Sequence, residues 1–162
     1  MDIATALSFL REFLLLILVF GALLAYSVVR GKRALISLIL GLYIALLVSL
    51  NFPYSERLYA FAGEGERAQA IAAIVLFALF AVLGSFLFER LLSYEYEESA
   101  FEGISKKALV AALGTMLVFA YSYHVLPVTT LIDPGSSISF IFAPEEYFFW
   151  MLIIPLVGLF LL

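Results

Sequence analysis

The sequence lacks cysteine altogether and holds a single histidine among its 162 residues. Without cysteine the chain forms no disulfide, and thiol catalysis, iron–sulfur clusters and cysteine-type zinc sites are excluded. A single histidine also leaves no His-x-x-x-His pair, the spacing that a histidine zinc site on a helix requires. We therefore expect no bound metal ion.

Charged residues are scarce as well, at 14% of the chain, whereas soluble domains average about 25%. Hydrophobic residues make up 65%, and the mean hydropathy is +1.11. The net charge is −4, and lysine and arginine form no large cluster, which argues against nucleic acid as a partner. The composition predicts an integral membrane protein whose partner is the lipid bilayer, with residues 1–162 forming a single transmembrane domain.

Five apolar stretches predict the membrane helices of an all-α bundle. They cover residues 13–29, 34–52, 68–88, 108–125 and 147–162. About 20 helical residues are needed to cross the hydrocarbon core of a bilayer. The last stretch, with 16 residues, is the shortest of the five, and Pro155 can kink it. We therefore expect four to five transmembrane helices and leave open whether residues 147–162 span the membrane or enter it halfway.

The second stretch carries a stripe of small residues, Ser37, Gly41, Ala45 and Ser49, at every fourth position. Residues with this spacing lie on one face of a helix. Small side chains let two helices approach closely in lipid. The stripe predicts a helix-packing face, and the alternative is a polar face along a conduction path.

The segments between the stretches differ in character. Residues 54–62 predict a short surface helix with aromatic side chains among the lipid headgroups. Residues 126–146 predict an apolar loop with a tight turn at residues 133–136. After the turn, Ile138, Phe140 and Phe142 are expected to be buried, either against the bundle or in the membrane interface.

Lysine and arginine are distributed unevenly between the predicted loops. Residues 30–33 and residues 89–107 hold three each, and in a five-helix count both segments lie on one side of the membrane. The other side holds only Arg11, Arg57 and Arg67. Loops rich in basic residues stay in the cytoplasm. We therefore expect a multi-pass cell-membrane protein with its N-terminus outside and, if five helices span, its C-terminus in the cytoplasm.

A polar cluster is predicted at the outer membrane edge, built from Tyr121, His124, Asp133 and Glu145. An imidazole near carboxylates can sense protons or bind an ion. The simpler interpretation is an interfacial aromatic cluster with a hydrogen-bonded histidine. Glu145 also has a structural explanation, because a carboxylate in the first turn of a helix interacts favourably with the helix dipole.

Catalytic chemistry has little support in the sequence. No ionisable residue lies deep within the five stretches, so a proton relay across the membrane is not indicated. No buried pair of nucleophile and base can be assembled, and neither a Walker A motif nor a Gly-x-Gly-x-x-Gly motif occurs. We expect a protein that is not an enzyme and that binds no cofactor.

One resemblance to a known family can be stated. The segments GALLAY (residues 21–26), VVRG (28–31) and ALISLILGL (34–42) resemble the first helical hairpin of the colicin V production protein family. Members of that family are small bacterial inner-membrane proteins. The matching positions are Arg30, Gly31 and Gly41. The resemblance implies a role in envelope homeostasis or export, with no established chemistry; otherwise the chain is similar to small bacterial multi-pass membrane proteins in general.

These observations lead to two functional hypotheses. The first is a non-enzymatic, multi-pass membrane protein that serves as a structural or accessory component of envelope maintenance or export. Its protein partner would be another copy of the chain or another membrane protein. The alternative is a small channel or transporter whose outer mouth lies near Tyr121, His124, Asp133 and Glu145.

Overall fold

The computed structural model describes residues 3–63, 65–91, 103–131 and 136–161, and within these ranges the chain is helical and contains no strand. Its elements in order are α1 (Ile3–Arg30), α2 (Lys32–Asn51), α3 (Ser55–Phe61), α4 (Glu66–Leu91), α5 (Ile104–His124), η1 (Pro127–Thr130), α6 (Ser136–Phe142) and α7 (Glu145–Leu161). Four of them, α1, α2, α4 and α5, are long and apolar enough to cross a membrane. The predicted all-α class is confirmed, and the protein is a multi-pass membrane protein.

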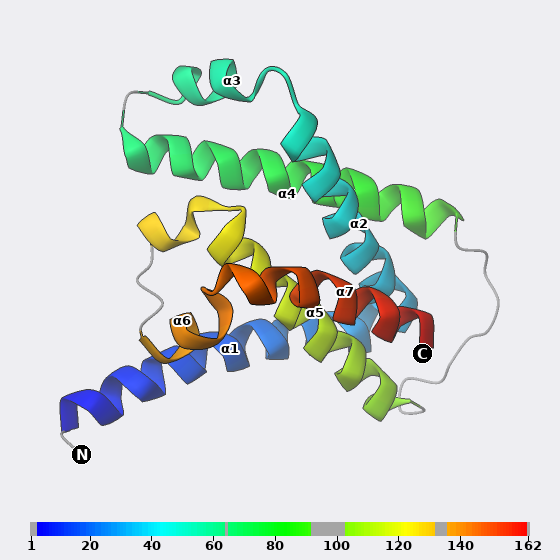
Figure 1. The fold of residues 1–162 in the computed structure, drawn as a ribbon. Coiled ribbons are helices and arrows are strands. Elements are labelled where there is room, and N and C mark those ends of the chain that lie inside the picture. Colours follow the sequence, from blue (N-terminus) through cyan, green and yellow to red (C-terminus); the bar gives the residue numbers. More distant parts are fainter. Residues whose placement is uncertain (1–2, 64, 92–102, 132–135, 162) are drawn as a thin grey trace.

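The five longest helices run back and forth between two ends of the molecule (Figure 1). One end, on the left of the figure, holds the N-terminus, α3, η1 and α6; we call it the α3–α6 end. The other, the Arg30 end, holds the α1–α2 turn, the start of α5 and the end of α7. Helices α2 and α4 cross each other on one side of the bundle, and α7 lies across α5 on the other.

The helices extend beyond the predicted apolar stretches into the flanking polar residues. Helix α1 is continuous over 28 residues and so begins ten residues before the predicted stretch 13–29. Helix α4 begins at Glu66 and includes Arg90 in its last turn. Helix α7 has 17 residues with Pro155 inside it, which corresponds to about 25 Å, less than the thickness of a typical hydrocarbon core. That α7 spans the membrane stays a prediction.

The predicted loop at residues 126–146 contains two short helices, η1 and α6, in its described parts. Phe142 is buried, but Phe140 is 82% exposed, so Phe140 does not pack against the bundle, and its burial in the membrane interface stays a prediction. Residues two apart on a helix point about 200° away from each other, and burying both against the bundle would have required another backbone conformation. The structure does not describe residues 133–135 of the predicted turn, and it does not describe the side chain of Ile138.

Helix α5 lies at the centre of the bundle and contacts α1, α2 and α7. Its side chains Val110, Ala111, Leu117 and Ala120 are fully buried. Helix α1 contrasts with it, because only 6% of the residues between Phe13 and Arg30 are buried. Exposed apolar side chains are compatible with lipid, whose acyl chains are as apolar as leucine.

Candidate functional site

The small-residue stripe of α2 packs directly on α4. A Cβ atom added at Gly41 would lie 2.5 Å from the backbone nitrogen of Ser85 and 2.6 Å from the backbone oxygen of Ala81. One added at Gly84 would lie 3.0 Å from Cα of Gly41. The two backbones therefore touch at a pair of glycines, and any larger residue at position 41 would separate the helices.

The other stripe residues continue this contact along α2. Ser37 and Ala45 are fully buried, and Ser49 is half-buried with its hydroxyl donating to the Leu46 carbonyl (3.0 Å). The hydroxyl of Ser37 has no hydrogen-bond partner among the described residues. The stripe thus packs inside the bundle, against α4 at Gly41, and its buried residues offer no surface to another protein.

A second set of contacts joins three helix termini at the Arg30 end. Gly31 alone separates α1 from α2, and its φ of +90° is a conformation that glycine adopts without strain. Arg33 donates from Nη2 to the backbone oxygen of Glu89 at 2.8 Å. Arg30 lies 3.8 Å from the Glu89 carboxylate, a partly exposed pair that contributes little stability. These contacts place the α1–α2 turn beside the end of α4.

His124, the last residue of α5, contacts the end of α6 and the first turns of α7. Its Nε2 lies 2.7 Å from the carbonyl oxygen of Phe142, to which the N–H tautomer donates. Its ring lies 4.6 Å from the ring of Phe148, centre to centre. The last carbonyl groups of a helix have no partner within that helix. His124 therefore caps α6, which is a structural role.

Tyr121, another member of the predicted polar cluster, packs against a different helix from His124. Tyr121 is 1% exposed, and its ring packs edge-on against Phe77 of α4 at 5.5 Å, centre to centre. Glu145 is exposed in the first turn of α7, and Asp133 lies outside the described residues. Tyr121 and His124 thus contact different neighbours, α4 for one and α6 with α7 for the other. Tyr121 lines no open mouth, because it is buried.

Sequence reasoning missed Tyr43, whose hydroxyl donates to the carbonyl oxygen of Leu152 at 2.5 Å and so joins α2 to α7. Leu152 lies three residues before Pro155, which is buried. Proline has no N–H, so Pro155 leaves the carbonyl of Met151, four residues before it, without its usual helical donor. The phenol donates to the neighbouring carbonyl of Leu152 in the same turn. A tyrosine in one apolar stretch and a proline in another were the available signal, but nothing in the sequence said that they meet.

Two further hydroxyl groups on α5 bond to carbonyl groups of their own helix. Thr115 donates to the Ala111 carbonyl (2.7 Å) and Ser122 to the Val118 carbonyl (2.8 Å). Within the described ranges, no three His, Cys, Asp or Glu side chains are grouped as a metal site would need. The polar side chains of the described helices mostly hold backbone carbonyls and converge on no common point.

Comparison of the chain with models of known protein families, with curated proteins and with solved structures finds no match. The resemblance of residues 21–42 to the colicin V production family therefore stays a prediction.

Proposed function

We propose that this protein is a non-enzymatic inner-membrane component that supports envelope maintenance or export by assembling with another membrane protein or with a second copy of itself. The observation that carries the proposal is the use of polar side chains to join helices, as in the hydrogen bonds of Tyr43 to Leu152 and of His124 to Phe142. The envelope role rests on the resemblance of residues 21–42 to a family with that role.

Helix α1 offers the face on which a partner would pack. Leu14, Ile17 and Leu18 are more than half exposed, and a Cβ atom added at Gly21 would meet nothing within 4 Å. Gly21 and Ala25, which is also exposed, form a small-xxx-small pair, a common site of helix association in lipid. Because the stripe on α2 packs inside the bundle, the partner of our proposal binds α1.

The orientation is part of the proposal. The α1–α2 turn holds Arg30, Lys32 and Arg33, and basic loops stay in the cytoplasm. The Arg30 end then faces the cytoplasm, and the N-terminus with α3 and α6 faces outward.

The test is purification of the tagged full-length chain from crosslinked native membranes, with identification of the proteins that accompany it. We expect a stoichiometric membrane-protein partner or a homo-oligomer. Replacing Gly21 and Ala25 with leucine should abolish that association and leave the unfolding transition unchanged. A chain that stays monomeric under crosslinking, or an association that survives the replacement, would overturn the proposal.

A small channel or transporter is the second candidate, and one observation favours it. The hydroxyl oxygens of Ser27, Ser37 and Tyr121 are buried and have no hydrogen-bond partner among the described residues. Buried polar groups without a protein partner are commonly bonded to ordered water, and a continuous path of water that joined these three groups would conduct. Solute flux through liposomes that contain the protein would support this function, and flux equal to that of empty liposomes would exclude it.

A further inference from the structure

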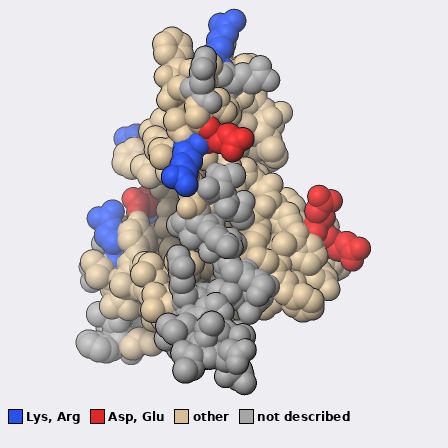
Figure 2. All heavy atoms as spheres, turned by 90° about the vertical axis from the view of Figure 1, so that its left-hand side faces the viewer, with Lys and Arg blue, Asp and Glu red and all other residues tan. Residues whose placement is uncertain are grey.

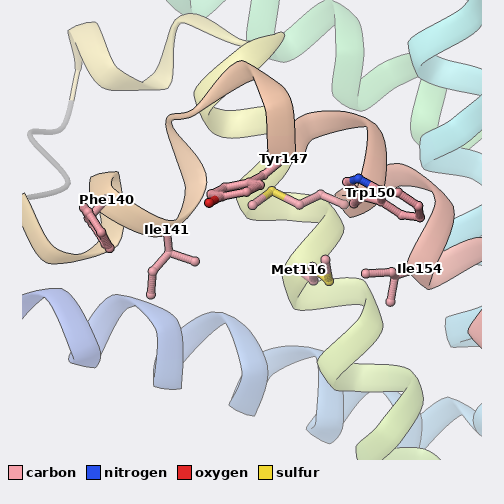
Figure 3. A pocket seen from close by; sticks show the side chains of 7 residues that line it. Met116, Phe140, Ile141, Tyr147, Trp150 and Ile154 are labelled. Atoms are coloured by element: carbon pink, nitrogen blue, oxygen red, sulfur yellow. The ribbon is translucent and has the colours of Figure 1, made fainter.

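An apolar groove with a volume of about 350 Å³ opens on the surface between α5, α6 and α7. Figure 3 shows side chains of α6 and α7 along its walls, with Met116 of α5 between them. The residues that line it include Met116, Phe140, Ile141, Tyr147, Trp150 and Ile154. Ligand sites in proteins begin at about this volume, so the groove has room for one hydrocarbon chain but not for a whole lipid.

The groove runs in the direction that an acyl chain takes in a bilayer. Tyr147, Trp150 and Ile154 are spaced by three and four residues on α7, so they follow one face of the helix over about 10 Å. Helix α7 runs from the α3–α6 end towards the Arg30 end (Figure 1). The groove therefore begins at the α3–α6 end, where tyrosine and tryptophan fit the headgroup region, and continues towards the membrane interior.

A carboxylate lies on α7 one helical turn before Trp150, which lines the groove. Glu146, Trp150 and Ile154 occupy every fourth position of α7, so Glu146 lies on the same face one turn before Trp150. Glu146 is exposed, and so is its neighbour Glu145. In Figure 2, which views the α3–α6 end, an acidic patch lies on the side of α7 with no Lys or Arg beside it.

The charge at this position selects among lipid headgroups. In the described parts of the three lining helices, Lys and Arg occur only as Lys106 and Lys107 of α5. Both lie at least nine residues before Met116, about 13 Å along the helix, so neither stands beside the groove. A carboxylate at the membrane surface attracts a cationic amine and repels a headgroup with net negative charge. An anionic phospholipid is thus disfavoured, and one with an amine in its headgroup is favoured.

We propose that the groove between α5, α6 and α7 binds one acyl chain of a phospholipid whose headgroup carries a cationic amine, with that amine beside Glu146. This inference goes beyond the proposed function and does not depend on it, because it rests on residues of α5, α6 and α7 and not on those of α1.

Trp150 is the only tryptophan in the chain and lines the groove, so its fluorescence reports directly on the groove's occupant. The full-length protein is reconstituted into vesicles of phosphatidylethanolamine and phosphatidylglycerol in equal amounts. In separate samples, one lipid or the other carries brominated acyl chains, which quench tryptophan on contact. We expect brominated phosphatidylethanolamine to quench about two- to fivefold more strongly, a preference of the size that an exposed charge pair provides.

Glu146→Gln should reduce this preference to nearly equal quenching by the two lipids. Glu66→Gln is the matched control, because Glu66 is likewise an exposed carboxylate in the first turn of a helix at the α3–α6 end. It should retain the preference. Both substitutions lie on the surface, and unchanged helical circular dichroism would show that folding is intact.

Three results would overturn the proposal. The first is equal quenching of the unchanged protein by the two lipids. The second is a preference that persists in Glu146→Gln. The third is no quenching by either lipid, because Trp150 would then be covered by protein, such as a second copy of the chain.

Discussion

Gly41 determines how closely α2 and α4 approach, because a methyl group at this position would lie 2.5 Å from a backbone nitrogen atom of the other helix. Backbone atoms cannot rotate away as a long side chain can. A methyl group added at Gly21 would meet no atom within 4 Å. These two helical glycines therefore have opposite roles, and a single substitution distinguishes them.

We expect Gly41→Ala to destabilise the protein by about 1–3 kcal/mol, the usual cost of overpacking a close contact. Gly21→Ala is the matched control and should be neutral or stabilising, since alanine favours a helix over glycine by about 1 kcal/mol. The measurement is the free energy of unfolding of the purified monomer in mixed micelles, titrated with a denaturing detergent. Equal changes for the two variants would contradict the assigned contact.

At the scale of whole helices, Tyr43 joins two elements. Its hydrogen bond to Leu152 is a polar link from α2 to α7. Apolar contacts also support α7. Met151 is buried, and a Cβ atom at Gly158 would lie 2.6 Å from the side chain of Leu113 on α5. Helix α7, with 17 residues, is shorter than the four helices long enough to cross a membrane, so these contacts decide how firmly it is held.

Replacing Tyr43 with phenylalanine should loosen α7 and leave the α2–α4 contact intact. The loss should be about 0.5–1.5 kcal/mol, the net value of one hydrogen bond. Hydrogen exchange followed by mass spectrometry should show faster exchange in the peptide that covers residues 145–161. Tyr26→Phe is the control, because the Tyr26 hydroxyl on α1 makes no hydrogen bond to a described residue. Faster exchange spread evenly over all helices would argue against a specific link.

The sequence predicts where each helix lies along the chain better than it predicts which helices pack against each other. Runs without charge define the membrane helices, and the four-residue spacing on α2 predicts a close-packed face. That α4 is the helix packed there depends on Gly84 meeting Gly41, which is a long-range contact with no local signal. The same limit applies to the cluster predicted around His124. Proximity to a membrane edge could be inferred, but not that α5 directs Tyr121 towards Phe77 and His124 towards Phe148.

The whole molecule has two chemically different ends. The Arg30 end is held by Arg30 and Arg33, which both contact Glu89. The α3–α6 end is held by aromatic contacts and by the bond from His124 to Phe142. Since basic residues at the first end outnumber those at the second, the bundle should insert in a single orientation.

The absence of native cysteine allows this orientation to be tested with single cysteine substitutions. In intact cells, a membrane-impermeant maleimide should label Tyr54→Cys, next to α3, and should label Lys32→Cys only after the membrane is permeabilised. The reverse pattern would overturn the proposed orientation. Leu161→Cys, at the exposed end of α7, then determines whether α7 spans. Labelling like Lys32→Cys means that it crosses the bilayer, because the two positions lie at the same end of the bundle (Figure 1). No labelling under either condition means that the helix ends within the hydrocarbon region.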